Sequence, residues 1–212
     1  MAVEPPRDVI FDLGGVLIDW DPRYLYRGMF AGDHSRMERF LAEVCTPAWN
    51  LELDRGRSFA EAVAELVERH PEHRAPIEAY HTRWIEMVAG PIEGTVAILE
   101  DLDRRGVALW ALTNWSAETF LLVRSDPAYA FLGRFRRIFV SGELRLIKPD
   151  PAIFRHVLDA IGAEPSSCLF IDDAEKNVAA ADRLGLRTHL FTGPDALRAD
   201  LTRRGLLAQP PP

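Results

Sequence analysis

Cysteine is scarce in this chain of 212 residues, which contains only Cys45 and Cys168. Both lie in apolar segments in different parts of the sequence, where a buried free thiol is the common state. A catalytic cysteine would need an activating base, and a disulfide would need an oxidising compartment, of which the sequence has no other sign. We therefore predict that both thiols are structural.

Long apolar runs and an excess of basic residues are also missing. No uninterrupted apolar segment approaches the roughly 20 residues that cross a bilayer. The N-terminal MAVEPPRD has no basic stretch that leads into an apolar one, as a secretory signal does. The formal net charge of -7 argues against a broad contact with nucleic acid, which needs clustered Lys and Arg. We expect a soluble, cytoplasmic protein that binds neither membrane nor nucleic acid.

Short β-branched or apolar runs alternate with amphipathic stretches, which is typical of β-α units around a parallel sheet. The runs are almost continuously hydrophobic, which predicts strands covered on both faces. Helices are expected over residues 95–105, 151–161 and 175–184, each followed by a glycine. The sequence therefore predicts an α/β fold with a doubly wound, Rossmann-like parallel sheet, whose five strands are 8–14, 107–114, 137–142, 167–173 and 188–191.

Residues 20–90 break this alternation, because they contain only helical signals. Ser58 and Glu61 in this segment have the spacing of a helix capping box. An insertion that leaves the end of the first strand lies over the crevice in which doubly wound sheets bind ligands. We predict a catalytic core of residues 1–19 and 91–212 and a small all-helical cap of residues 20–90. Residues 205–212 have no periodicity and are expected to form a loose tail.

Carboxylates stand at the ends of two predicted strands. Asp12 ends the first strand, just before Gly14 and Gly15, which let the backbone bend sharply and approach a ligand closely. Asp172 and Asp173 end the fourth, and two adjacent negative charges repel unless a cation lies beside them. Magnesium prefers oxygen ligands, so Asp12 and one of this pair would suffice to hold it. The alternative is that each carboxylate only caps a turn or a helix.

Two further polar segments accompany these carboxylates. Lys148, in the segment LIKP, becomes a clamp for phosphate and carboxylate if the acidic groups lie near it, and is otherwise a solvated surface residue. Thr113 and Asn114 end the second strand, where they either hold phosphoryl oxygens or mark an ordinary turn. Such signals at four successive strand ends are hard to obtain by chance.

With these residues in place, the sequence resembles the haloacid-dehalogenase-like hydrolase superfamily from Val9 to about Phe191. VIFDLGGVL is similar to its first motif, ALTN to its second, KPDPAIF to its third and FIDDAEKN to its fourth. The resemblance implies a capped, Mg²⁺-dependent phosphatase that acts on a small phosphorylated metabolite. Asp12 would take the phosphoryl group as an aspartyl-phosphate, which splits the hydrolysis into capture and release.

The resemblance also implies how the phosphoryl group is held. Thr113 and Asn114 would bind the transferring group, and Lys148 would act as a catalytic residue that steadies the charge developing on it. Most of the protein's contribution to such a reaction is positioning and charge neutralisation.

The resemblance places the magnesium ion as well. Asp173 and the carbonyl of Gly14 would join Asp12 in binding Mg²⁺. Asp172 would lie beside them at the edge of the metal site as part of the catalytic group, and Asn177 would stand where many members have a further acidic residue.

Gly14 departs from the pattern of this superfamily, whose phosphatases commonly carry Asp there as the general acid and base. Loss of a positioned general acid lowers the rate by about 10²–10⁴. Three explanations are open: another acid such as Asp19 or Asp21 reaches the site, the substrate has an easily departing alcohol, or the protein is no longer a competent phosphatase. The sequence also resembles a subgroup with Gly here that includes glucose 1-phosphate phosphatases. Anomeric phosphates depart readily, so we expect a sugar phosphate or a similar small phosphomonoester.

Two other functions are alternatives. A metal-independent 2-haloacid dehalogenase also lacks an acid at this position, but it has no need of the pair Asp172-Asp173, which favours a phosphatase. The other is a noncatalytic binding protein of the same fold. In the cap, Arg23 is the candidate for contacting the substrate. Trp20 and Trp115 adjoin the motifs and either border the pocket or pack in the core.

Overall fold

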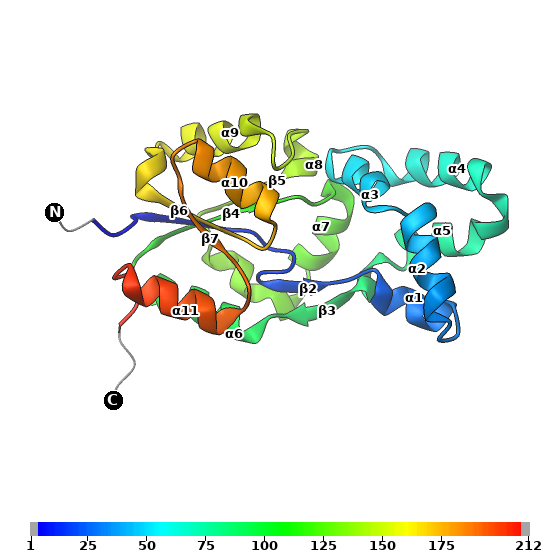
Figure 1. Ribbon diagram of the computed structural model, residues 1–212, viewed down its shortest axis with the longest axis horizontal. Coiled ribbons are helices and arrows are strands. Elements are labelled where there is room, and N and C mark those ends of the chain that lie inside the picture. The colour runs from blue at the N-terminus through cyan, green and yellow to red at the C-terminus, as the bar shows by residue number, and fades with distance from the viewer. Residues whose placement is uncertain (1–3, 209–212) are drawn as a thin grey trace.

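The central sheet has five parallel strands in the order β5-β4-β1-β6-β7 (Figure 1). This computed structural model describes residues 4–208 of the chain. Each strand overlaps its predicted range, which confirms the α/β fold with a doubly wound parallel sheet. The strands are β1 (Asp8–Phe11), β4 (Ala108–Thr113), β5 (Arg137–Val140), β6 (Cys168–Asp172) and β7 (Arg187–Leu190).

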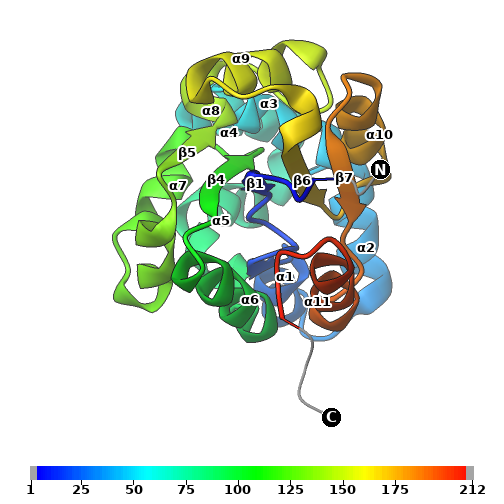
Figure 2. The same cartoon turned by 90° about the vertical axis from the view of Figure 1, so that its left-hand side faces the viewer.

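Both faces of this sheet are buried, as the continuous hydrophobicity of its strands predicted. Successive side chains of a strand point to opposite faces, so Val9 and Phe11 belong to one hydrophobic cluster and Ile10 to another. Helices α9 (Pro151–Ile161) and α10 (Glu175–Arg183) cover the face of Ile10, and Figure 2 shows α9 above the sheet. Helices α6 (Glu93–Arg104), α7 (Ala117–Arg124) and α11 (Pro194–Arg203) cover the opposite face.

The predicted helical insertion forms a separate lobe beyond the carboxyl ends of the strands (Figure 1). Aromatic rings fill its interior, where the centroid of Tyr26 lies 5.0 Å from that of Phe40 and 6.3 Å from that of Tyr80. Ser58 is the N-terminal capping residue of a helix, as predicted, because its hydroxyl accepts a hydrogen bond from the Glu61 backbone N–H at 3.3 Å. The helices are α1 (Arg23–Met29), α2 (His34–Glu43), α3 (Pro47–Asp54), α4 (Phe59–Arg69) and α5 (Arg74–Thr82), with 3-10 turns η1 (Pro71–His73) and η2 (Trp84–Met87).

A two-stranded ribbon connects the lobe to the sheet. Strand β2 (Ile18–Trp20) pairs antiparallel with β3 (Val88–Pro91). The prediction that residues 20–90 contain only helices was therefore wrong at both ends of this range, where Trp20 belongs to β2 and Val88 begins β3. Strands this short leave almost no period-2 pattern, and pairing between distant segments creates them. The predicted domain boundaries fall within this ribbon.

Several other elements were not anticipated. Helices α7 and α11 were not predicted, nor were the short elements α8 (Ser141–Leu144), η3 (Pro127–Arg134) and η4 (Pro165–Ser167). The expected loose tail was wrong in part, because Leu206 and Leu207 are buried in the core. Residues 209–212 of that tail lie outside the described range. Cys45 and Cys168 are buried free thiols, as predicted.

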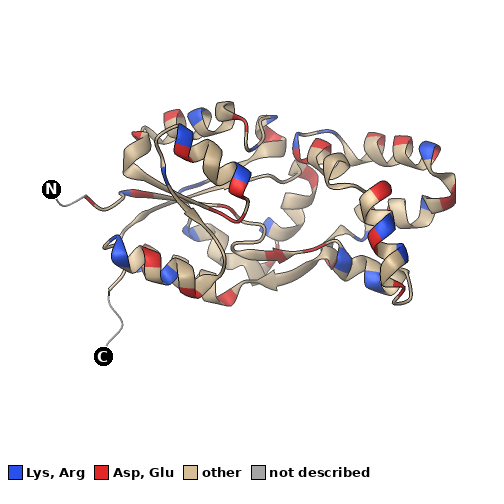
Figure 3. Cartoon of the chain, in the orientation of Figure 1, with Lys and Arg blue, Asp and Glu red and all other residues tan. Residues whose placement is uncertain are grey.

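Charged residues of both signs are interspersed along the helices of the two lobes (Figure 3). Many of them form local pairs on one helix, such as Arg83 with Glu86 and Arg74 with Glu78. Within residues 4–208, no helix combines the length and the apolar character needed to span a membrane.

Candidate active site

The sheet brings the predicted site residues to one edge. Strand β1 lies between β4 and β6, so their carboxyl ends are neighbours, and ligands of doubly wound sheets bind there. Asp12 directly follows β1, Thr113 ends β4 and Asp172 ends β6. The loop ahead of α9 delivers Lys148 to the same edge, where its ammonium meets Asp12 and Asp172.

Lys148 is the centre of this group. Its Nζ lies 2.9 Å from Asp12 Oδ2 and 2.7 Å from Asp172 Oδ2, and it donates a hydrogen bond to the Leu112 carbonyl at 2.9 Å. These three partners match the three donors of an ammonium group. The residue is 1% exposed, so it is not the solvated surface lysine that its sequence context alone would suggest. Burial lowers the pKa of Lys148, but the charges of Asp12 and Asp172 outweigh this effect and raise it.

Asp172 anchors the site and does not face solvent. Its Oδ1 accepts hydrogen bonds from the Ala174 backbone N–H at 2.9 Å and from Asn177 Nδ2 at 3.0 Å. Its Oδ2 accepts from Lys148 and, at 3.1 Å, from Asn177. Both oxygens are therefore occupied, and Asp172 holds the ammonium against Asp12 while it joins β6 to the start of α10.

Asn114 fixes the loop that carries Lys148. Its Oδ1 accepts a hydrogen bond from the Lys148 backbone N–H at 2.9 Å, and its Nδ2 donates to the Lys148 carbonyl at 3.0 Å. Both polar ends of the amide are used in this way, so Asn114 positions Lys148 in addition to bordering the pocket. Thr113, at the end of β4, is buried.

Asp12, Asp172 and Asp173 form a group that could hold a metal ion. One ligand oxygen of each lies within 4.8 Å of the others. Burial raises the pKa of Asp12 to about 8; Lys148 opposes this rise, whereas Asp172 and Asp173 reinforce it. Burial and the charge of Asp172 also raise the pKa of Asp173. Three carboxylates face one ammonium, so the group has an excess of negative charge that a divalent cation would offset.

The donor set fits magnesium. Each Asp172 oxygen already accepts two hydrogen bonds, whereas each Asp12 oxygen has one such contact, so Asp12 and the exposed Asp173 have more capacity to bind a cation. One or two carboxylates, with waters and substrate phosphate, make up the usual magnesium site. When bound, the ion would neutralise phosphoryl oxygens and the excess charge of the carboxylates.

The two glycines after Asp12 differ in their surroundings. Gly15 has φ +74°, and a Cβ on it would lie 2.3 Å from Asp173 Oδ2, so only glycine lets this carboxylate approach the turn. A Cβ on Gly14 would meet nothing within 4 Å. The general acid expected at position 14 is therefore absent although there is space for its side chain.

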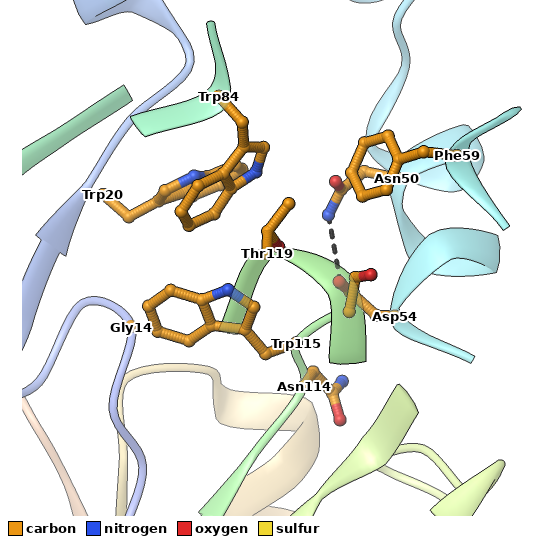
Figure 4. A pocket seen from close by; sticks show the side chains of 10 residues that line it. Gly14, Trp20, Asn50, Asp54, Phe59, Trp84, Asn114, Trp115 and Thr119 are labelled. Atoms are coloured by element: carbon orange, nitrogen blue, oxygen red, sulfur yellow. Dashed lines mark hydrogen bonds between the residues drawn. The ribbon is translucent and has the colours of Figure 1, made fainter. Parts of the chain in front are cut away.

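A cavity between core and cap opens beside Gly14 (Figure 4). Trp20 and Trp115 line it, together with Trp84 of η2, so these aromatic side chains border the pocket while they also pack in or against the core. Asp54 and Asn50 of α3 reach it from the cap. The remaining lining residues are Phe59, Asn114, Ser116 and Thr119.

Arg23 is not brought to this cavity. Its guanidinium binds Glu38 at 2.6 Å and Asp21 at 3.2 Å, and it lines a different hollow of the cap. Asp19 is likewise engaged, because Tyr24 donates its hydroxyl to both carboxylate oxygens at 2.9 and 3.0 Å.

Asp54, Asn50 and Phe59 are pocket residues that sequence reasoning missed. They lie on or beside two cap helices, and no local spacing distinguishes them from other residues of an amphipathic helix. Only the docking of α3 against the core makes them neighbours of Gly14. The acidic residue at the end of α3, two positions before Gly56, was the one signal available.

Curated relatives of the chain include phosphatases. It is 32% identical over 162 residues to phosphoserine phosphatase from Thermus thermophilus, a match that covers 73% of this chain and 63% of the relative. It is 25% identical over 180 residues to the sesquiterpene phosphatase astK from Aspergillus oryzae, with 85% and 87% covered. The chain spans 13%, 46% and 63% of the length of three curated proteins that it matches.

A solved structure shares the fold. The wild-type enzyme bt-2542 from Bacteroides thetaiotaomicron, in complex with magnesium and inorganic phosphate, matches with a TM-score of 0.66 and 23% identity, over 89% of this chain and 95% of that one. The model of the haloacid dehalogenase-like hydrolase family matches residues 8–185. This range includes all four predicted motifs and the whole cap, and the chain belongs to the haloacid dehalogenase-like hydrolases.

Proposed function

We propose that the chain is a Mg²⁺-dependent phosphatase that hydrolyses a small phosphomonoester through an aspartyl-phosphate on Asp12. The observation that carries this proposal is the buried Lys148 bridge between Asp12 and Asp172, with Asp173 beside it. This arrangement supports the assignment of Asp12 as the nucleophile, of Lys148 as the cation beside it and of Asp173 as a metal-binding carboxylate.

Each residue of the candidate site then has a defined role. Asp12 Oδ1 accepts a hydrogen bond from the Leu13 backbone N–H at 2.7 Å and Oδ2 contacts Lys148, so the nucleophile is held in one orientation. Thr113 and Asn114 border the place of the phosphoryl group, and Lys148 neutralises the charge that develops there. Asp12, Asp173 and the Gly14 carbonyl would hold Mg²⁺, which supplies charge neutralisation to the transferring group.

The cavity supports a sugar phosphate as the substrate class. Indole faces suit the C–H faces of a sugar ring, and polar groups on the same wall suit its hydroxyls. Asn50, Asp54 and Thr119 supply polar side chains to the cavity wall, which fits a ligand rich in oxygen.

Phosphate release tests the proposal. We expect turnover of a panel of phosphomonoesters with Mg²⁺, loss of turnover with EDTA, and α-glucose 1-phosphate hydrolysed faster than glucose 6-phosphate. Asp12→Asn is the control and should be inactive. No turnover of the panel, or an Asp12→Asn variant as active as the parent, would refute the phosphatase. Release of chloride from 2-chloropropionate in the presence of EDTA would indicate that the chain is a dehalogenase instead.

A further inference from the structure

The proposed phosphatase lacks a proton donor at position 14. When the P–O bond of a phosphomonoester breaks, the departing alkoxide needs a proton, and Gly14 has no group that provides one. A residue elsewhere in the cavity can do so only if it lies beside the same phosphoryl position, is held in place and carries a proton near neutral pH.

Asp54 lies in the required place. It is the last residue of α3, and its side chain lines the cavity together with Gly14 and Asn114 (Figure 4). Asn114 is bonded to the backbone of Lys148, so this wall of the cavity adjoins the loop that carries Lys148, and Gly14 is two residues from Asp12.

The backbone at Asp54 is fixed to the catalytic core. The Ser141 hydroxyl donates a hydrogen bond to the Asp54 carbonyl at 2.6 Å and accepts one from the Trp115 backbone N–H at 2.9 Å. Two residues further on, a Cβ on Gly56 would lie 2.7 Å from the Gly142 carbonyl, so cap and core backbones are in close contact there. These contacts attach the end of α3 to the core.

The carboxyl group is oriented by two further residues. Asn50 Nδ2 donates to Asp54 Oδ2 at 3.0 Å, and the Tyr80 hydroxyl donates to Asn50 Oδ1 at 2.8 Å. Burial raises the pKa of Tyr80 well above its ordinary value, so this hydroxyl keeps its proton and fixes which end of the amide faces Asp54. Asn50 therefore orients the carboxyl group through Oδ2.

Asp54 also has the acidity of a general acid. Asp54 is only partly exposed, and the protein atoms around its carboxyl group disfavour the charged form. Burial accordingly raises the pKa of Asp54 to about 7, against the opposing effects of the Ser116 backbone N–H and of Lys148. A catalytic acid works best when its pKa lies near the operating pH.

We propose, on the basis of the proposed phosphatase function, that Asp54 of the cap is the proton donor that replaces the absent acid at position 14. In the first step, an Asp12 oxygen forms a bond to phosphorus while the bond from phosphorus to the alcohol oxygen breaks. The alcohol oxygen takes the proton of Asp54 and leaves as a neutral alcohol. In the second step, water attacks the aspartyl-phosphate, gives a proton to the Asp54 carboxylate, and releases phosphate and Asp12.

The other candidate acids do not line this cavity. Both oxygens of Asp19 accept the Tyr24 hydroxyl, and Asp21 Oδ1 accepts hydrogen bonds from the backbone N–H and the guanidinium of Arg23. Asp19→Asn and Asp21→Asn therefore serve as the competing variants. Glu52→Gln, which removes a charge from the outer side of the same helix, where Glu52 pairs with Arg55, is the matched control.

A pair of aryl phosphates tests the proton donor. p-Nitrophenolate departs without a proton, whereas the more basic phenolate of phenyl phosphate gains from one. For Asp54→Asn we expect kcat/KM for phenyl phosphate to fall by about 10²-fold and that for p-nitrophenyl phosphate to fall much less. Glu52→Gln should change neither. Equal losses on the two substrates, or a selective loss in Asp19→Asn or Asp21→Asn instead, would overturn the role of Asp54.

A second variant guards against a merely structural effect. A Cβ at position 14 meets nothing within 4 Å, so Gly14→Asp in the Asp54→Asn background should recover phenyl phosphate turnover selectively. Failure to recover it, with normal thermal unfolding, would contradict the proposal. Absence of p-nitrophenyl phosphate turnover in the wild type would instead refute the phosphatase function itself, so the two failures are distinguishable.

Discussion

Replacing Lys148 with Met should destabilise the metal-free protein strongly. The Lys148 ammonium is 1% exposed and lies within 2.9 Å of two carboxylates, so its removal leaves buried negative charges without their partner. Removing one partner of a buried ion pair lowers the free energy of unfolding by about 3–5 kcal/mol. For a chain of this size each kcal/mol shifts the melting temperature by about 2–4 °C. The expected decrease is therefore about 6–20 °C.

Thermal unfolding followed by far-UV circular dichroism measures this decrease. Lys176 is the only other lysine of the sequence and is exposed on α10, so Lys176→Met is the matched control and should unfold like the wild type. Mg²⁺ should raise the melting temperature of Lys148→Met more than that of the wild type, because the cation then replaces part of the missing charge. If Lys148→Met in EDTA has the same melting temperature as Lys176→Met, the ammonium does not neutralise these carboxylates and the reasoning fails.

Three further predictions concern the surrounding residues. Gly15→Ala should weaken Mg²⁺ binding by about 10–100-fold, because its Cβ would displace Asp173, whereas Gly14→Ala should not; equal affinities by titration calorimetry would contradict this. Ser141→Ala should lower the free energy of unfolding by about 1–3 kcal/mol, since it removes the hydrogen bonds between α3 and the core; denaturant unfolding with an unchanged midpoint would disprove it. As pH rises through about 7, the pKa of Asp54, its carboxyl loses the proton, so kcat/KM for phenyl phosphate should fall relative to that for p-nitrophenyl phosphate, and a ratio that stays constant through neutral pH would exclude this.

The sheet could be predicted from the sequence because its strands are buried on both faces. Strands β1, β4 and β6 are short, almost continuous apolar runs, and each ends at or just before a polar residue, so the sequence pattern also marks where the strand ends. The convergence of Asp12, Lys148 and Asp172 follows from the same feature, since the carboxyl ends of neighbouring parallel strands meet at one edge.

The sequence could not predict the ribbon β2–β3 or the ion pair of Arg23 with Glu38, because both are contacts between segments that are distant in sequence. Strands of three or four residues are stabilised by pairing between Ile18–Trp20 and Val88–Pro91, which are far apart in sequence. Arg23 lies beside Asp21 in the sequence, but its second partner, Glu38, comes from the next helix, and their pairing depends on how α1 and α2 pack. The local sequence pattern does not indicate either contact.

The identity of the proton donor illustrates the same division between local and tertiary information. Asp12 and Asp173 belong to segments whose chemistry is visible in a few consecutive residues, whereas Asp54 acquires its role from the docking of α3 onto Ser141 and Gly142. A nucleophile on the core and a proton donor on the cap would complete the catalytic group only when the two lobes are docked. Such an arrangement ties proton transfer to the docked state of the two lobes, and it lets position 14 remain glycine without loss of the acid.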